Sequence, residues 1–169
     1  MEQTFSRRGF LKGAAAAALA VSAMGLTGCA GEGGPTTAVV LGDYKVDVDV
    51  RKSTRRSDTR NNKTTGILLP VVYITNQTGS VMELKLTASV FKAAASDGTE
   101  LKFDSALQPL TLVQKVPASV TPSFSTTDEE VFQKLSSGEL SLKLSITLSG
   151  QTAVYTMNFG DLTQTVEKI

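Results

Sequence analysis

The stretch Leu140-Ser-Leu-Lys-Leu-Ser-Ile-Thr-Leu148 alternates large apolar residues with polar ones over nine positions. This two-residue period is typical of a β-strand with one buried face. Ser149-Gly150-Gln151 then offers residues that favour a tight turn, and Ala153–Phe159 resumes the alternation. The stretch therefore predicts an antiparallel hairpin, and it is the strongest secondary-structure signal in the chain.

Similar alternation predicts further short strands upstream. From Tyr44 to Val50, aromatic and β-branched residues alternate with charged ones, which indicates a half-buried strand. The run Ile67–Ile74 is apolar on both faces and predicts a central strand, in which Pro70 marks a bulge or an edge because proline cannot donate to a ladder. The same alternation predicts a strand over residues 84–90, a short strand over 101–103 and, as a weaker candidate, a strand over 110–113.

One short helix is expected before Gly138. Thr127 and Glu130 fit a capping box, and acidic residues from Asp128 onward occupy the first turn, where the helix dipole favours negative charge. About seven short strands at this spacing, without a regular strand–helix alternation, predict an all-β antiparallel sandwich or barrel.

The composition excludes several classes of chemistry. The 169 residues include one Cys and no His, and the formal net charge is +1. Ser-His-Asp and Cys-His catalysis, histidine metal sites, cysteine clusters and intramolecular disulfides are therefore excluded. We expect no cofactor, no metal and no enzymatic activity, and the near-neutral charge offers no field for nucleic acid.

The one carboxylate pair with catalytic spacing is Asp47 and Asp49. Alternate residues of a strand lie about 6.6–6.8 Å apart, within the range that glycosidases use. The pair alternates with Lys45 and Arg51 on what should be the solvent face. We therefore expect a solvated strand surface, and a hydrolase built from carboxylates is the less favoured alternative.

The N-terminus has the layout of an export signal. A charged start precedes an apolar run from Ala14 to Leu26, which is shorter than the roughly 20 residues of a membrane-spanning helix. The start resembles the twin-arginine export signal, S-R-R-x-F-L-K. The residues that match it are Ser6, Arg7, Arg8, Phe10, Leu11 and Lys12.

Directly after the apolar run, Leu26-Thr27-Gly28-Cys29 resembles the lipobox of bacterial lipoproteins. The resemblance implies that Cys29, the sole Cys, is acylated and becomes the first residue of the mature chain. We thus expect a signal peptide over residues 1–28, a lipidated Cys and Gly-rich tether over 29–40, and a domain over 41–169. The implied location is the outer face of the cytoplasmic membrane.

The rest of the chain resembles the immunoglobulin-like domain of bacterial lipoproteins over roughly residues 40–160. The resemblance rests on the strand ending at Ile74-Thr75-Asn76, on the hairpin Phe91-Lys…Asp97-Gly98…Leu101 and on the last leucine-alternating pair. Pro117–Pro122 and the acidic helix depart from the family pattern. The resemblance implies an immunoglobulin-like sandwich at the cell surface and carries no catalytic residues.

Residues 51–63 hold six basic residues and one acid, with no aromatic residue between them. We expect a solvated, mobile loop. The alternative is an electrostatic contact with an envelope polyanion, anionic lipid or acidic partner protein. The candidate contact residues are Arg51, Lys52, Arg55, Arg56, Arg60 and Lys63.

Together these features predict a lipid-anchored, extracytoplasmic binding or accessory module without enzymatic activity. The alternative function is a structural subunit of an exported redox or transport complex, since the twin-arginine route often carries cofactor enzymes.

Overall fold

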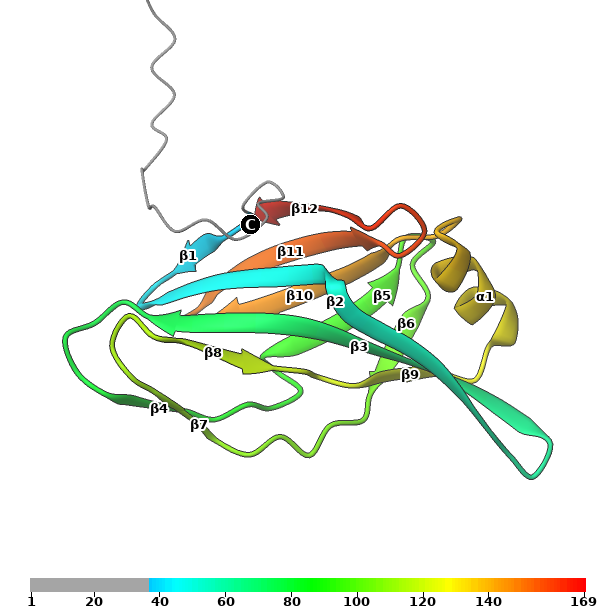
Figure 1. The fold of residues 1–169 in the computed structure, drawn as a ribbon, viewed down its shortest axis with the longest axis horizontal. Coiled ribbons are helices and arrows are strands. Elements are labelled where there is room, and N and C mark those ends of the chain that lie inside the picture. Colours follow the sequence, from blue (N-terminus) through cyan, green and yellow to red (C-terminus); the bar gives the residue numbers. More distant parts are fainter. Residues whose placement is uncertain (1–36) are drawn as a thin grey trace, which may run out of the picture. The chain divides into compact units, whose positions relative to one another are not determined.

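The computed structural model describes residues 37–169, which fold as twelve β-strands and one α-helix (Figure 1). The strands are β1 (Val39–Leu41), β2 (Tyr44–Arg60), β3 (Lys63–Asn76), β4 (Met82–Leu84), β5 (Phe91–Ala95), β6 (Glu100–Phe103), β7 (Leu110–Leu112), β8 (Pro117–Val120), β9 (Phe124–Thr126), β10 (Leu142–Leu148), β11 (Gln151–Asn158) and β12 (Thr163–Lys168). The helix is α1 (Glu129–Ser137).

Ten of the strands form one nearly closed, barrel-like sheet. Its order is β1-β2-β3-β9-β6-β5-β10-β11-β12, β8 also pairs with β3, and the named strand pairs are antiparallel. Side chains rather than a backbone ladder connect the two ends of this sheet. The Lys168 ammonium of β12 donates to the Val40 carbonyl of β1 at 2.9 Å. One strand further in on each side, the Tyr155 hydroxyl of β11 donates to the Val46 carbonyl of β2 at 2.8 Å.

The alternating residues predicted to be buried form the core. Leu142, Leu144 and Ile146 of β10 are fully buried, and they face Val46, Val48 and other apolar residues of β2 and β3 across the interior. The burial of these apolar faces is the main term that favours this fold. The predicted hairpin over residues 140–159 is confirmed as β10 and β11, joined at Ser149 and Gly150.

The all-β antiparallel prediction is confirmed, but the number of strands is not. The structure has twelve strands instead of about seven, and the β6–β9 pair joins the two layers that a sandwich would keep apart. The strand expected over residues 84–90 is wrong, since only β4 forms there and Leu86 and Val90 enter the core from irregular chain. Strand β12 was not predicted, because its sequence is mostly polar.

The predicted helix is present as α1, with a different N-cap. The Asp128 carboxylate accepts the backbone N–H of Val131 at 3.1 Å, so the cap lies one residue later than Thr127. Gly138 ends the helix with a φ of 85°, as glycine does at this position. The helix packs on β3 through Phe132, whose ring occupies the space that a Cβ on Gly66 would need.

The predicted export signal and lipobox lie outside the described residues. This applies to Arg7, Arg8, Phe10, Leu11, Lys12, Leu26, Thr27, Gly28 and Cys29. The described chain begins at Thr37, so β1 takes up the last residues of the predicted tether. Within residues 37–169, no helix is both long enough and apolar enough to cross a membrane.

Candidate anion-binding arm

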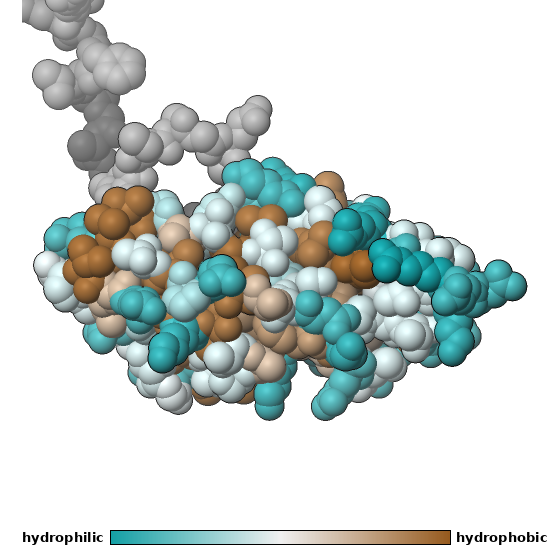
Figure 2. Space-filling model, turned by 90° about the horizontal axis from the view of Figure 1, so that it is seen from below, coloured by the Kyte–Doolittle hydropathy of each residue, from teal (hydrophilic) through white to brown (hydrophobic). Residues whose placement is uncertain are grey.

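Residues 51–63, here called the basic arm, form the outer part of the β2–β3 hairpin and not a loop. Asn61 and Asn62 join the strands with φ values of 51° and 57°. Positive φ at both residues makes a type I′ turn, which matches the twist of the flanking strands. The hairpin projects from the rest of the sheet in Figure 1, and hydrophilic side chains gather at that end in Figure 2.

A bulge in β2 lies at the base of the arm, opposite Pro70. Asp49 pairs with Val71 and Thr54 pairs with Leu69, so the four residues 50–53 of β2 face the single residue Pro70, and β2 has three additional residues there. Of the bulge or edge expected at Pro70, the structure has a bulge, and the additional residues lie on the facing strand β2. Proline supplies no N–H to a ladder, and the additional residues let the pairing resume beyond it.

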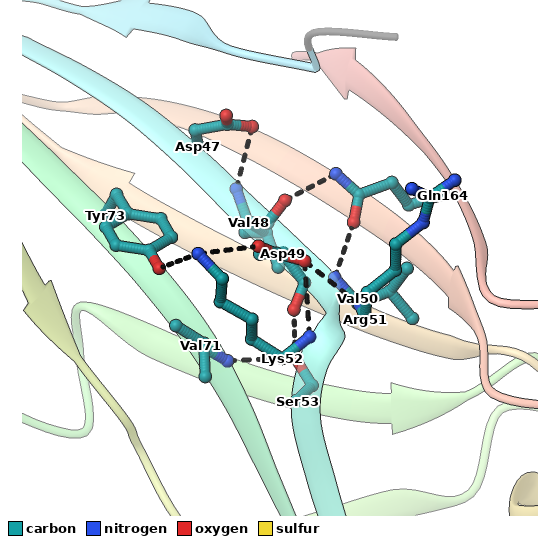
Figure 3. Close-up of polar contacts among 10 residues, drawn as sticks. All are labelled: Asp47, Val48, Asp49, Val50, Arg51, Lys52, Ser53, Val71, Tyr73 and Gln164. Carbon is teal, nitrogen blue, oxygen red and sulfur yellow. Dashed lines mark hydrogen bonds and ion pairs between the residues drawn. The ribbon is translucent and has the colours of Figure 1, made fainter. Parts of the chain in front are cut away.

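The Ser53 hydroxyl satisfies the backbone inside the bulge (Figure 3). It donates to the Asp49 carbonyl at 2.6 Å and accepts the backbone N–H of Val71 at 2.9 Å. Ser53 is buried, so water has little access to either group. One hydroxyl thus connects β2 to β3 where the regular ladder is interrupted.

The Asp49 carboxylate also belongs to the bulge. It accepts the backbone N–H groups of Arg51 and Lys52 at 3.1 and 3.2 Å, and the Lys52 ammonium lies 3.5 Å away. Lys52 also donates to the Tyr73 hydroxyl at 3.1 Å and lies 5.4 Å from the centre of its ring. The contact with Tyr73, together with Asp49, raises the pKa of Lys52. Asp49 is therefore a structural carboxylate.

Beyond the bulge, the cross-strand register separates the basic side chains. Arg56 is opposite Ile67 and Arg60 is opposite Lys63, and these alternate pairs share one face of the hairpin with Asp58. The Arg60 side chain is 84% exposed and lies 3.0 Å from the Asp58 carboxylate. Arg55 lies on the opposite face, where its guanidinium is 5.7 Å from the centre of the Phe159 ring.

The six candidate residues therefore have three environments. Arg56, Arg60 and Lys63 form a solvent-facing group, Arg55 packs against Phe159 just beyond the end of β11, and Arg51 and Lys52 lie in the bulge. Over residues 51–63 there are six basic residues and one acid, while the other described residues have eight basic and thirteen acidic ones. The arm is the positive end of a molecule whose remainder is negative.

Asp47 does not join Asp49 in an open site. It is half-buried, and it accepts the Thr37 hydroxyl at 3.0 Å and the Val48 N–H at 2.9 Å. Burial raises the pKa of Asp47, and these hydrogen bonds oppose the rise. Asp47 and Asp49 are both half-buried, so this face is less solvated than the sequence led us to expect. Among residues 37–169, no group of three or more His, Cys, Asp or Glu residues has metal-binding geometry.

Sequence reasoning missed Gln164, which completes the outer edge of β2 near the bulge. Its side-chain oxygen accepts the Val50 N–H at 2.8 Å, and its amide donates to the Val48 carbonyl (Figure 3). The same amide also donates to the Thr37 hydroxyl. A single side chain of β12 thus takes the place of a neighbouring strand. No local pattern could reveal this role, since the partners lie more than a hundred positions away in the sequence.

Comparison with known proteins does not establish a family. No family model matches the sequence, and no curated protein matches it. One solved structure is similar, a crystal structure from Bacillus subtilis described as that of a putative lipoprotein, YcdA. The two share 14% sequence identity with a TM-score of 0.44, over 80% of this chain and 39% of the other.

Proposed function

We propose that this chain is a lipid-anchored, extracytoplasmic, non-enzymatic binding module whose basic arm contacts an anionic partner. The projecting arm carries the proposal, because its charge is opposite to that of the remaining described residues. The anchor and the route rest on the sequence motifs at Arg7-Arg8 and Cys29. An immunoglobulin-like origin of the domain is part of the same proposal and rests on the family resemblance.

The geometry of the arm suits an electrostatic contact. The Arg60 side chain is almost fully solvated, so little desolvation opposes an approaching anion. Single exposed ion pairs contribute only about 0–1 kcal/mol. Several cations on one face act together, because their summed field raises the rate of encounter with a negative surface.

The arm also lies far from the N-terminal end of the described chain. Thr37 bonds to Asp47, and the arm tip follows at Arg60 on the same strand. At about 3.3 Å per residue this separation is roughly 40 Å. With Cys29 anchored in the membrane and the domain upright, the tip would lie several Debye lengths, each about 8 Å, from the head groups. The arm is then placed to meet partners that lie outward from the membrane.

The test removes charge from the arm and measures retention on isolated cell-wall polymer. Changing Arg55, Arg56 and Arg60 to Gln should weaken retention, with the greatest loss at low salt, where charges are least screened. Lys85, Lys92 and Lys143 are exposed cations outside the arm, and their change to Gln is the matched control. Retention that is the same for all three proteins at every salt concentration would contradict the proposal.

A further inference from the structure

The outer edge of β2 is unpaired along the arm. Within the part of the chain that the structure describes, β1 covers this edge only at Tyr44–Val46, and the Gln164 side chain continues to Val50. From Thr54 to Arg60, β2 has a paired strand on one side, β3, and none on the other. In Figure 1 no strand lies along the outer edge of this part of β2, while β9 lies on the other side of the hairpin, beside β3.

The register identifies which backbone groups this edge exposes. In a two-residue hairpin, the residues that flank the turn form a hydrogen-bonded pair, here Arg60 and Lys63. Alternate residues back along β2 therefore direct their N–H and C=O groups away from β3. These residues are Arg55, Ser57 and Thr59. An unpaired row of this kind is a template for a further strand.

The charge of the arm determines which strand fits. A second copy of this chain would bring another strongly basic arm against the first, and like charges on paired strands are destabilising. An acidic strand instead places carboxylates about 5 Å from the row that holds Arg56 and Arg60. A polymer without peptide groups can use the cations but leaves the free N–H and C=O groups unpaired.

We propose that residues 54–60 of β2 bind an acidic, extended segment of a partner protein as an added strand. This inference rests on the proposed function and specifies its partner. The backbone of the partner would pair with Arg55, Ser57 and Thr59, and its acidic side chains would face Arg56 and Arg60. Main-chain pairing supplies affinity and charge supplies selectivity.

The experiment uses the mature lipidated chain in detergent with two probes. One probe is an eight-residue peptide of alternating Glu and Val, and the other is linear polyphosphate. Hydrogen exchange with residue-level mass spectrometry should show the amides of Arg55, Ser57 and Thr59 exchanging at least tenfold more slowly with the peptide. Polyphosphate should leave these three amides unprotected.

Variants separate main-chain pairing from charge. Ser57→Pro removes one outward N–H from an edge where proline is tolerated, and it should weaken peptide binding at least tenfold while polyphosphate binding persists. Ser57→Ala is the matched control and should bind both probes normally. Arg56→Gln with Arg60→Gln should weaken the binding of both probes. Circular dichroism checks the fold, and Thr59→Pro replaces Ser57→Pro if that variant does not fold.

Three outcomes would overturn the inference. If the peptide binds wild type and Ser57→Pro equally without slowing the three amides, the contact uses side chains alone, and the proposed function survives. If neither probe binds the wild-type chain, the proposed function fails as well. If the exchange of these three amides becomes slower as the protein concentration rises, without any peptide, then a second copy of the chain pairs with this edge. In that case the proposal of an acidic partner is wrong.

Discussion

Replacing Ser53 by alanine should destabilise the domain, because it leaves two backbone groups without a hydrogen-bond partner. The variant removes the hydroxyl that bonds the Asp49 carbonyl and the Val71 N–H. Ser53 is 8% exposed, so water only partly replaces these bonds. Leaving a buried polar group unpaired costs about 1–3 kcal/mol. For a domain of this size, each kcal/mol lost from the free energy of unfolding lowers the midpoint of thermal unfolding by about 4 °C. The midpoint should therefore fall by roughly 4–12 °C.

The measurement is thermal and urea unfolding followed by far-ultraviolet circular dichroism, because the chain has no Trp. Ser57→Ala is the control, since Ser57 is exposed on the same strand. That control should stay within about 0.5 kcal/mol of wild type. A Ser53→Ala variant as stable as the Ser57→Ala control would refute the view that one hydroxyl connects the strands at the bulge.

Three further changes test other parts of the structure. Asp47→Asn should raise the midpoint of thermal unfolding at pH 7 but not near pH 3. Burial raises the pKa of the Asp47 carboxyl above its usual value of 3.8, so the folded state favours the neutral form. At pH 7 the carboxyl is charged and this charge destabilises the fold, whereas near pH 3 the carboxyl is mostly neutral and the Asn variant gains nothing. Gly66→Ala should cost about 1–3 kcal/mol in urea unfolding, because its Cβ overlaps Phe132, whereas Gly79→Ala, with open space around it, should not. Cys29→Ala should abolish labelling by fatty acid and release the protein from the membrane fraction; a variant that is still processed and membrane-bound would contradict the lipobox interpretation.

Strand β10 and the Pro70 bulge were predictable because their causes are local. Alternation along β10 reports directly which face is buried, and the missing N–H of Pro70 interrupts the ladder in any antiparallel pairing. The residues that repair the bulge were not predictable. Ser53 and Gln164 act through tertiary contacts, and neither stands in a pattern that differs from ordinary surface sequence.

The basic arm is a strand pair that the charged composition of residues 51–63 makes hard to predict. Its charged residues break the apolar alternation, so the segment was expected to be a loop. It is extended because the Asn61–Asn62 turn and the pairing with β3 hold it, and this turn was an available signal that the charge run obscured. Over residues 84–90 the error is the opposite one. The alternation predicts a strand, but Leu86 and Val90 are buried in the core without forming one.

The hydrogen bonds of Thr37 with Asp47 and Gln164, here called the Thr37 clasp, have a mechanical consequence. Thr37 is hydrogen-bonded to Asp47 and Gln164, so tension arriving from the N-terminal side of the domain meets this clasp first. The same strand, β2, continues from the clasp to the arm. With the proposed anchor and partner, a pull between them would act along β2. Because both points of load lie on β2, its covalent backbone would carry the tension between them, and the hydrogen bonds to β3 would keep the strand extended.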